Sequence, residues 1–177
     1  MNRMTGKPEV FVAALSLGGN TGDVAAAFCA ALQALAAHEH VRVIARSNVW
    51  RTPPWGKTDQ PDFLNMCVSI ETSLAPRALL DLCLAIERAA GRERLERWGP
   101  RPLDIDIITY GDLVVDEPEL TIPHPRAHER AFVLVPLAEI AGDVRLGHST
   151  IAERAARSDC DGMSRDAGAT ALIANVY

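Results

Sequence analysis

The stretch VFVAALSLGGNTGDVAAAFCAALQALAA, residues 10–37, predicts how the chain begins to fold. Its first eight residues are apolar except for one serine, which is typical of a buried strand. The glycine-rich segment Gly18–Gly22 is expected to end that strand in a turn that shapes the floor of a pocket. Thr21 or Asp23 can then cap a helix over Val24–Ala37. We therefore expect a strand that passes through a tight turn into a helix.

Outward from this unit, the hydrophobic pattern alternates between strand and helix periods. Strands are expected at Val41–Trp50, Asn65–Thr72 and Leu103–Thr109, with short strand-like pieces at Leu113–Val115 and Leu120–Ile122. Helices are expected at Pro76–Ala90, where Gly91 ends the helix, at Arg130–Ile140 and at Ile151–Ala156. The order βαββαβ favours an α+β sandwich, with a mainly antiparallel sheet and helices on one face of it. We expect one domain over residues 1–177, with the tail 143–177 packed on its core.

Composition and charge exclude several classes of partner. The chain has 177 residues, 48% hydrophobic and 23% charged, as is usual for a soluble globular protein. Its net charge of −5 repels nucleic acid and anionic lipid, so any polyanion must be bound through a local cluster of cations. No segment approaches the length of a membrane span. The four cysteines lack metal-ligand spacing and are expected to be reduced thiols, so we expect a cytoplasmic protein.

The segment Leu103-Asp104-Ile105-Asp106-Ile107 is the most informative part of the chain. Side chains alternate along a strand, so Asp104 and Asp106 point the same way, roughly 6.6 Å apart. Their carboxylates could converge on hard cations such as Mg²⁺, in the manner of two-metal phosphoryl-transfer sites. Alternatively, a half-buried strand simply carries two aspartates on its polar face, and this pattern alone does not decide between the two interpretations.

An arginine-rich loop precedes this strand and favours the first interpretation. Four arginines lie within ten residues, Arg92, Arg94, Arg97 and Arg101, on a loop that also contains Trp98. The planar guanidinium group matches phosphate oxygens and stays charged at any working pH. A solvated loop, with its arginines paired to Glu93 and Glu96, is the alternative. Arginines gathered beside two metal-competent aspartates in a net-acidic chain indicate a metal–polyphosphate site.

A histidine and several aromatic residues complete the candidate site. His124, held between two prolines, could hydrogen-bond a phosphate together with Arg130, or could equally be a surface turn residue. A flat heterocycle requires an aromatic side chain on each face and fixed polar groups at its edge. Phe63 and Phe132 could provide the faces and Asn65 the edge, although ordinary core packing of two phenylalanines remains open on spacing alone.

Four segments together resemble one family, the 6-hydroxymethyl-7,8-dihydropterin pyrophosphokinases of folate biosynthesis. These segments are LSLGGN at 15–20, TPPWG through DQP to FLN at 52–65, IE and GR through WGPRPLDID at 86–106, and IPHPR through AFVL at 122–134. They follow one another in order and at family-like spacing from about Val10 to Gly142, a recognisable core of residues 10–142. The run WGPRPLDID is the most specific of them.

The resemblance implies a ferredoxin-like α+β fold, a monomer, and an ATP-dependent enzyme with two Mg²⁺ ions. Its reaction would move the β,γ-pyrophosphate of ATP onto 6-hydroxymethyl-7,8-dihydropterin and release AMP, without a dedicated base. Asp104 and Asp106 would hold the ions and, with Arg92 and Arg101, carry catalysis. The remaining implied contacts are with ATP for Glu87, Arg92, Arg94, Trp98, Arg101, His124 and Arg130, and with the pterin for Thr52, Pro54, Trp55, Phe63, Asn65 and Phe132.

The chain departs from the family pattern at three positions. Gly19 stands where serine is common, and we expect this to be tolerated. Pro102 replaces a frequent threonine and is expected to stiffen the catalytic loop, while Pro125 stands where some members have an aromatic residue. Two rival functions remain: another magnesium-dependent transferase that releases ADP or pyrophosphate, and a non-catalytic ligand-binding module on the same scaffold.

Overall fold

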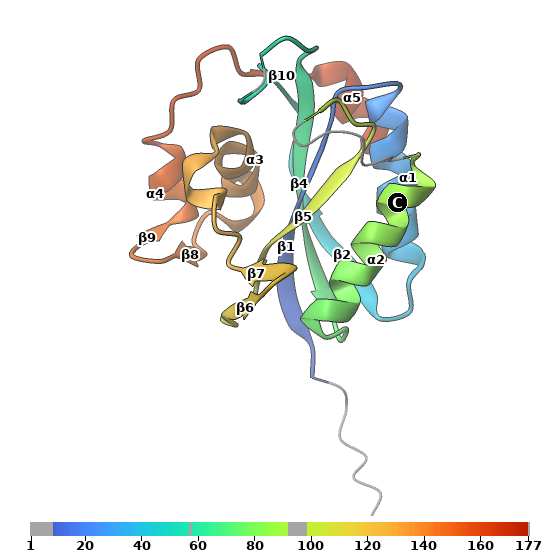
Figure 1. Cartoon of the computed structure of the whole chain (residues 1–177), viewed down its shortest axis with the longest axis vertical. Coiled ribbons are helices and arrows are strands. Elements are labelled where there is room, and N and C mark those ends of the chain that lie inside the picture. Colours follow the sequence, from blue (N-terminus) through green and yellow to red (C-terminus); the bar gives the residue numbers. More distant parts are fainter. Residues whose placement is uncertain (1–8, 57, 92–98, 177) are drawn as a thin grey trace, which may run out of the picture.

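The main sheet is antiparallel throughout and is built from the N-terminal two thirds of the chain plus one late strand. The structure is a computed structural model that describes residues 9–56, 58–91 and 99–176. Within these residues the sheet contains β1 (Phe11–Gly19), β2 (Val41–Arg46), β3 (Trp50–Thr52), β4 (Phe63–Thr72), β5 (Asp104–Tyr110) and β10 (Ser164–Arg165). The strand order is β10-β3-β4-β1-β5, and β2 pairs with a further part of β4 (Figure 1). This is the ferredoxin-like arrangement expected from the sequence.

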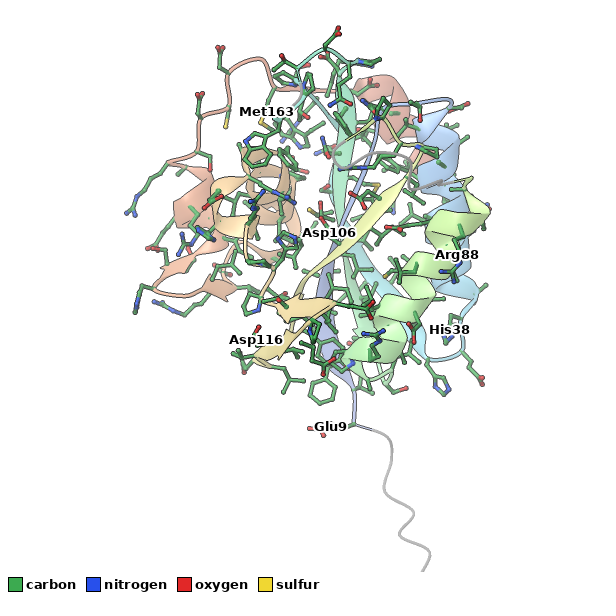
Figure 2. All side chains as sticks on the ribbon, in the orientation of Figure 1. Glu9, His38, Arg88, Asp106, Asp116 and Met163 are labelled. Atoms are coloured by element: carbon green, nitrogen blue, oxygen red, sulfur yellow. The ribbon has the colours of Figure 1, made fainter. Side chains whose placement is uncertain are left out.

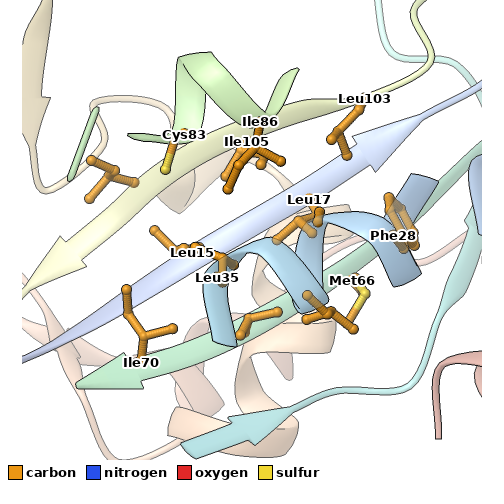
Figure 3. Packing of buried hydrophobic residues seen from close by; sticks show 14 of the residues in the cluster. Leu15, Leu17, Phe28, Leu35, Met66, Ile70, Cys83, Ile86, Leu103 and Ile105 are labelled. Atoms are coloured by element: carbon orange, nitrogen blue, oxygen red, sulfur yellow. The ribbon is translucent and has the colours of Figure 1, made fainter. Parts of the chain in front are cut away.

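Helices cover both faces of this sheet. On one face, α1 (Val24–Ala37) and α2 (Pro76–Ala89) pack on buried side chains such as Leu15, Met66 and Ile105 (Figure 3). On the other face, α3 (Ala131–Ala141) and α4 (Ile151–Ala155) pack on a second cluster that includes Ala14, Cys67 and Ile108. In Figure 1 the two groups of helices lie on opposite sides of the central strands.

The expectation that all helices lie on one face was therefore wrong. The central strands are apolar at successive positions, not at alternate ones: Ala13, Ala14 and Leu15 are all buried. Such continuous apolar runs are typical of strands covered on both sides. The site described below lies on the α3 face of the sheet.

Element boundaries agree closely in the first half of the chain. The helix α1 has the expected bounds, with the Asp23 carboxylate accepting a hydrogen bond from the Ala26 N–H at 3.0 Å, so Asp23 is the cap. After α2, Gly91 adopts φ +82°, a left-handed conformation that favours glycine and ends the helix. The first strand, however, continues through Gly18 and Gly19. The second expected strand is broken at 47–49 into β2 and β3.

The chain from residue 111 onward contains short elements. These are β6 (Val115–Glu117), β7 (Leu120–Ile122), a 3₁₀ turn (Ala127–Glu129), β8 (Arg145–Leu146), β9 (Ser149–Thr150) and α5 (Ala167–Ile173).

The cysteines and the helices agree with the expectations from composition. All four cysteines are free thiols, and burial raises the pKa of the Cys67 and Cys83 thiols. In the described part of the chain no helix is both long and apolar enough to cross a membrane.

The C-terminal segment, residues 143–176, packs on both sides of the sheet. Its β8–β9 hairpin and α4 join the α3 cluster through Leu146 and Ile151, whereas α5 joins the α1 cluster through Ala169 and Ile173. Between them, β10 pairs with β3. Sequence reasoning missed β10 and α5, because two-residue and seven-residue elements give almost no periodic signal and are stabilised by tertiary contacts.

We expect Ile173→Ala to lower the free energy of unfolding by about 2–4 kcal/mol, because its side chain is 1% exposed within the main core. Its neighbour Leu172 is 51% exposed, so Leu172→Ala is the matched control and should cost well under 1 kcal/mol. Urea denaturation of both variants measures the difference. Equal stability of the two variants would mean that the C-terminal segment does not unfold together with the core.

Candidate active site

The floor of the candidate site consists of side chains on neighbouring strands that face α3. Asp104 of β5 lies directly opposite Gly18 of β1, and Gly18 lies opposite Asn65 of β4. In the next row, Asp106, Ser16 and Cys67 are cross-strand neighbours. Residues opposite one another in antiparallel strands point to the same side. The register therefore brings both aspartates onto one face, as their alternation in the sequence predicted, and Asn65 lies on that face too.

Gly18 leaves room between the acidic residues and Asn65. A Cβ atom at this position would lie 2.8 Å from the Asn65 Oδ1 atom. The Asn65 Nδ2 donates a hydrogen bond of 2.8 Å to the Thr52 Oγ1, and both residues are buried. The amide is therefore held in one orientation, with its carbonyl oxygen toward Gly18. A substrate at this point would meet a fixed polar edge.

Both aspartates are paired with arginines from outside the sheet. The Arg101 guanidinium lies 2.9 Å from the Asp104 Oδ2, and the Arg130 Nη1 lies 3.4 Å from the Asp106 Oδ2. The side chains of Arg101 and Arg130 are 26% and 15% exposed, so these are not loose surface pairs. Burial lowers the pKa of Arg130, and the nearby Asp106 and Asp104 act against this shift. Figure 2 shows Asp106 between the sheet and the helices on the α3 side.

The two arginines keep unused hydrogen-bonding capacity inside the protein. Among the described residues, the buried side-chain nitrogens without a partner are the Arg101 Nε and the Arg130 Nε. A buried N–H without an acceptor is costly, and native structures rarely contain one without a reason. Both atoms flank the acidic pair. Phosphate oxygens are the acceptors that guanidinium groups bind best, so these orphaned donors fit a polyphosphate.

Aromatic side chains form the walls of the pocket next to the arginines. The Arg101 guanidinium lies 5.6 Å from the ring centre of Phe63, and the Arg130 guanidinium lies 5.6 Å from those of both Trp55 and Phe132. The ring faces that hold these cations are also the surfaces on which a flat heterocycle would stack. The pocket is lined by Ser16, Gly18, Thr52, Pro53, Trp55, Gln60, Phe63, Asn65, Arg101, Asp104, Asp106, Arg130 and Phe132.

Asn20 joins the two loops that border the pocket. Its Nδ2 donates to the Gln60 Oε1 at 3.0 Å and to the Pro61 carbonyl at 3.2 Å. Its Oδ1 accepts from the Arg101 N–H at 3.0 Å, and its own N–H donates to the Arg101 carbonyl at 2.9 Å. Sequence reasoning placed the glycine-rich segment at the pocket floor but did not single out Asn20, Ser16 or Gln60. Their sequence signal is weak, since it consists of one polar residue beside a turn.

His124 lies at the edge of the acidic pair and is expected to be neutral. Its Nε2 lies 3.8 Å from the Asp106 Oδ2, too far for a hydrogen bond, and its Nδ1 accepts from the Arg126 N–H at 3.2 Å. Burial, together with the positive charges of Arg130 and Arg126, lowers the pKa of His124 to about 4, although Asp104 acts in the opposite direction. An ordinary surface turn histidine, the alternative that the sequence left open, would be more exposed than the 19% of the His124 side chain.

Several predicted site residues lie elsewhere. The buried Glu87 carboxylate comes from α2, which covers the opposite face of the sheet, and accepts the Ile105 N–H at 2.7 Å. It supports the strand between the two aspartates and does not line the pocket. Pro54 lines a neighbouring groove with Trp55. Arg92, Arg94 and Trp98, together with Arg97, lie outside the described residues.

The donor set is compatible with magnesium. Mg²⁺ in nucleotide sites is usually held by one or two carboxylates, with substrate phosphates and water completing its shell. Asp104 and Asp106 offer such a pair, and no group of three acidic, histidine or cysteine ligands exists among the described residues that would form an all-protein cage. An acidic pair beside buried guanidinium groups and an aromatic pocket is the arrangement that transfer of a phosphate-containing group to a flat acceptor requires.

Comparisons with known proteins agree with this class. Residues 14–142 match the family model of the 7,8-dihydro-6-hydroxymethylpterin-pyrophosphokinases. The chain is 52% identical over 151 residues to the 2-amino-4-hydroxy-6-hydroxymethyldihydropteridine pyrophosphokinase of Methylorubrum extorquens, covering 85% of this chain and 96% of that protein. It is 42% identical over 142 residues to the enzyme of the same name from Haemophilus influenzae, covering 80% and 89%. The chain belongs to this pyrophosphokinase family.

Solved structures support the fold independently. The wild-type Plasmodium falciparum HPPK-DHPS crystal structure superposes with a TM-score of 0.68 at 13% sequence identity. The match covers 86% of this chain and 45% of that longer chain. At this identity the likeness establishes the ferredoxin-like architecture alone.

We expect Gly19→Ala to destabilise the protein by about 1–3 kcal/mol, because the added Cβ would lie 2.4 Å from the Pro102 carbonyl oxygen. This atom belongs to the backbone and cannot rotate away, so the segment that carries Arg101 must shift. Two departures from the family pattern, Gly19 and Pro102, thus face each other. Gly168→Ala is the control, since its nearest neighbour is 3.6 Å away. Equal urea midpoints for the two variants would contradict the predicted clash.

The low pKa of His124 predicts a pH-dependent stability. Between about pH 4 and 6.5 the unfolded chain binds a proton at this histidine that the folded protein does not. The free energy of unfolding of the ligand-free protein should therefore fall as the pH drops through this window. In His124→Asn this fall should be smaller, whereas the exposed His148→Asn should keep the wild-type slope. Parallel slopes for wild type and His124→Asn in urea titrations would refute the prediction.

Proposed function

We propose that this chain transfers the β,γ-pyrophosphoryl unit of ATP to the hydroxymethyl oxygen of 6-hydroxymethyl-7,8-dihydropterin, a step of folate biosynthesis. A bond forms between that oxygen and the β-phosphorus, the bond from the β-phosphorus to the oxygen bridging to the α-phosphate breaks, and AMP leaves. The family match and the named relatives support this reaction. The observation that carries it to particular residues is the acidic pair flanked by two buried arginines with unused N–H groups.

Asp104 and Asp106 would hold Mg²⁺, for which we propose two ions. Bound there, the ions would neutralise charge that develops on the phosphate oxygens. Because both carboxylates are engaged by arginines, we expect metal–nucleotide binding to release these guanidinium groups from the aspartates. Arg101 and Arg130 can then turn their donors, including the orphaned Nε atoms, to the phosphate chain. The same two arginines would thus pair with the aspartates in the ligand-free site and with the phosphates in the nucleotide-bound site.

The pterin would occupy the aromatic part of the pocket. Phe63 and Phe132 would stack on its two faces, while Trp55, 44% exposed, would close the open side. The Asn65 amide, held by its hydrogen bond to the Thr52 hydroxyl, would offer the pterin a polar edge at the floor. Since Asn65 and Asp104 flank Gly18, a heterocycle held at this edge would lie next to the acidic pair, across Gly18.

Catalysis on this arrangement rests on positioning and electrostatics. Holding the hydroxyl and the β-phosphorus together removes most of the entropic cost of their encounter. Fixed cations around the phosphates stabilise the transition state without reorganising water. The neutral His124, beside Asp106, can hydrogen-bond a phosphate oxygen without adding charge. A dedicated base is not needed, in line with a hydroxyl attacking an already activated anhydride.

Several finer features belong to the proposal. We expect a monomer that works in the cytoplasm as one domain over residues 1–177. Arg92, Arg94 and Trp98 are proposed to contact ATP, as the resemblance implies. Glu87 is proposed to act on the nucleotide side through the strand that it supports, since its carboxylate holds the Ile105 N–H.

Asp104→Asn and Asp106→Asn should each reduce turnover by about 10²–10³-fold, since each removes a metal ligand where transition-state charge develops. The exposed Asp116→Asn on β6 is the matched control and should keep wild-type activity. The assay mixes protein, MgATP and the hydroxymethyl-dihydropterin and identifies the nucleotide product.

AMP should form only when the pterin is present. Formation of ADP or release of pyrophosphate would keep the site but assign it to one of the rival transferases. Tight pterin binding without turnover, unaffected by magnesium and by both substitutions, would support the ligand-binding module instead.

A further inference from the structure

Glu139 is the centre of a hydrogen-bond network outside the pocket. From the third turn of α3, its carboxylate accepts four hydrogen bonds. The Asn48 N–H and the Asn48 Nδ2 donate to Oε2 at 2.7 and 3.0 Å. The Trp50 Nε1 and the Arg165 Nη2 donate to Oε1 at 3.3 and 3.0 Å. The donors come from the break between β2 and β3, from β3 itself and from β10.

This network differs from an ordinary surface ion pair. The Glu139 side chain is 19% exposed, and both of its oxygens are used. The indole of Trp50 is in turn covered by the Arg165 guanidinium, 5.3 Å from the ring centre. By comparison, the Glu71 carboxylate on β4 accepts from the Arg42 guanidinium at the far part of the sheet, in an open pair whose arginine is 69% exposed. Charge-assisted bonds from three segments to one carboxylate restrict all three.

The two elements joined by Glu139 also form two walls of the pocket. On α3, Phe132 precedes Glu139 by seven residues, so both lie on the same side of the helix, about 10 Å apart along its axis. The helix is continuous between them, with Pro136 inside it. On β3, Thr52 follows Trp50 by two residues and points to the same side of the sheet. Both Phe132 and Thr52 line the pocket.

Helix α3 and strand β3 are thus joined at one end of their contact, and the pocket lies between them at the other end. The Glu139–Trp50 contact lies at the fastened end, and the Phe132 and Thr52 side chains lie at the open end. Thr52 also holds Asn65, so a shift of β3 would move the polar edge as well as the wall. The acidic pair on β5, separated from β3 by β4 and β1, would be affected much less.

We propose that Glu139 is a positioning residue for the pterin: it sets the spacing between Phe132 and the Thr52–Asn65 edge by fastening α3 to β3. The proposal rests on the pterin pocket assigned above. Arg165 of β10 takes part in the same network, so the C-terminal segment contributes to substrate binding without touching the substrate.

The test compares steady-state kinetics of wild type, Glu139→Gln, Trp50→Phe and Glu71→Gln. Glu139→Gln replaces one acceptor by an NH₂ group that must face donors, and should raise KM for the pterin about tenfold. Its KM for ATP should change less than twofold. Trp50→Phe removes a single donor and keeps the ring, so it should change the pterin KM in the same direction by a smaller factor. Glu71→Gln should leave both KM values at the wild-type level.

A binding measurement separates positioning from general destabilisation. Calorimetric titration of the pterin into protein loaded with magnesium and α,β-methylene-ATP should show the same loss of affinity for Glu139→Gln. If the variants unfold at lower temperature but bind the pterin as tightly as wild type, Glu139 is merely structural and the proposal is wrong. Equal rises in both KM values would also refute it. Absence of pyrophosphoryl transfer in wild type would instead refute the proposed function.

Discussion

Gly18 lies directly between Asp104 and Asn65 because β1 pairs with β5 on one side and with β4 on the other. This register sets the distance between the acidic pair on β5 and the Asn65 amide on β4. The two lie on either side of β1, across Gly18, which has no side chain. A shift by one residue would turn both aspartates toward the α1–α2 core. The apolar side chains of Leu17 and Ile105, buried in that core, oppose such a shift. Packing on one face thereby fixes the chemistry on the other.

The positive charge at the site depends on two partly buried arginines and not on the net charge of the chain. The chain carries a charge of −5, yet Arg101 and Arg130 are held beside the acidic pair with part of their donor capacity unused. Without metal, the aspartates balance these arginines. We expect that binding of a metal–nucleotide complex exchanges these partners, so that carboxylates contact cations and guanidinium groups contact phosphates. The stacking of the same arginines on Phe63, Trp55 and Phe132 would link this exchange to opening of the pterin pocket.

Much of the framework could be predicted from the sequence, because it depends on local patterns. The bounds of α1, the glycine that ends α2 and the shared direction of Asp104 and Asp106 all follow from short-range periodicity. Helices on both faces of the sheet were not predicted, although the continuous burial of Ala13, Ala14 and Leu15 explains them. The Glu139 network could not be predicted, because Glu139 lies 91 and 89 residues from Asn48 and Trp50 and 26 residues from Arg165, and these side chains meet only through the packing of α3 and β10.

The same reasoning explains why site residues were predicted unevenly. Asp104, Asp106 and Arg101 stand in one short motif, and the structure brings them together with Arg130 and Phe63. Asn20 was missed because its three partners lie in two other loops. Glu87 was assigned to the nucleotide from its place in a family-like segment. Its carboxylate also accepts a backbone N–H of β5, a contact that depends on the packing of α2 on that strand and has no signal in the sequence.

We propose that the β5 aspartates hold the metal ions that accompany the nucleotide. The most direct test counts Mn²⁺ ions bound per chain by electron paramagnetic resonance, in the presence of α,β-methylene-ATP. We expect two ions for wild type and a loss of bound ions in both Asp104→Asn and Asp106→Asn. Wild-type occupancy in both variants would contradict it and place the metal elsewhere.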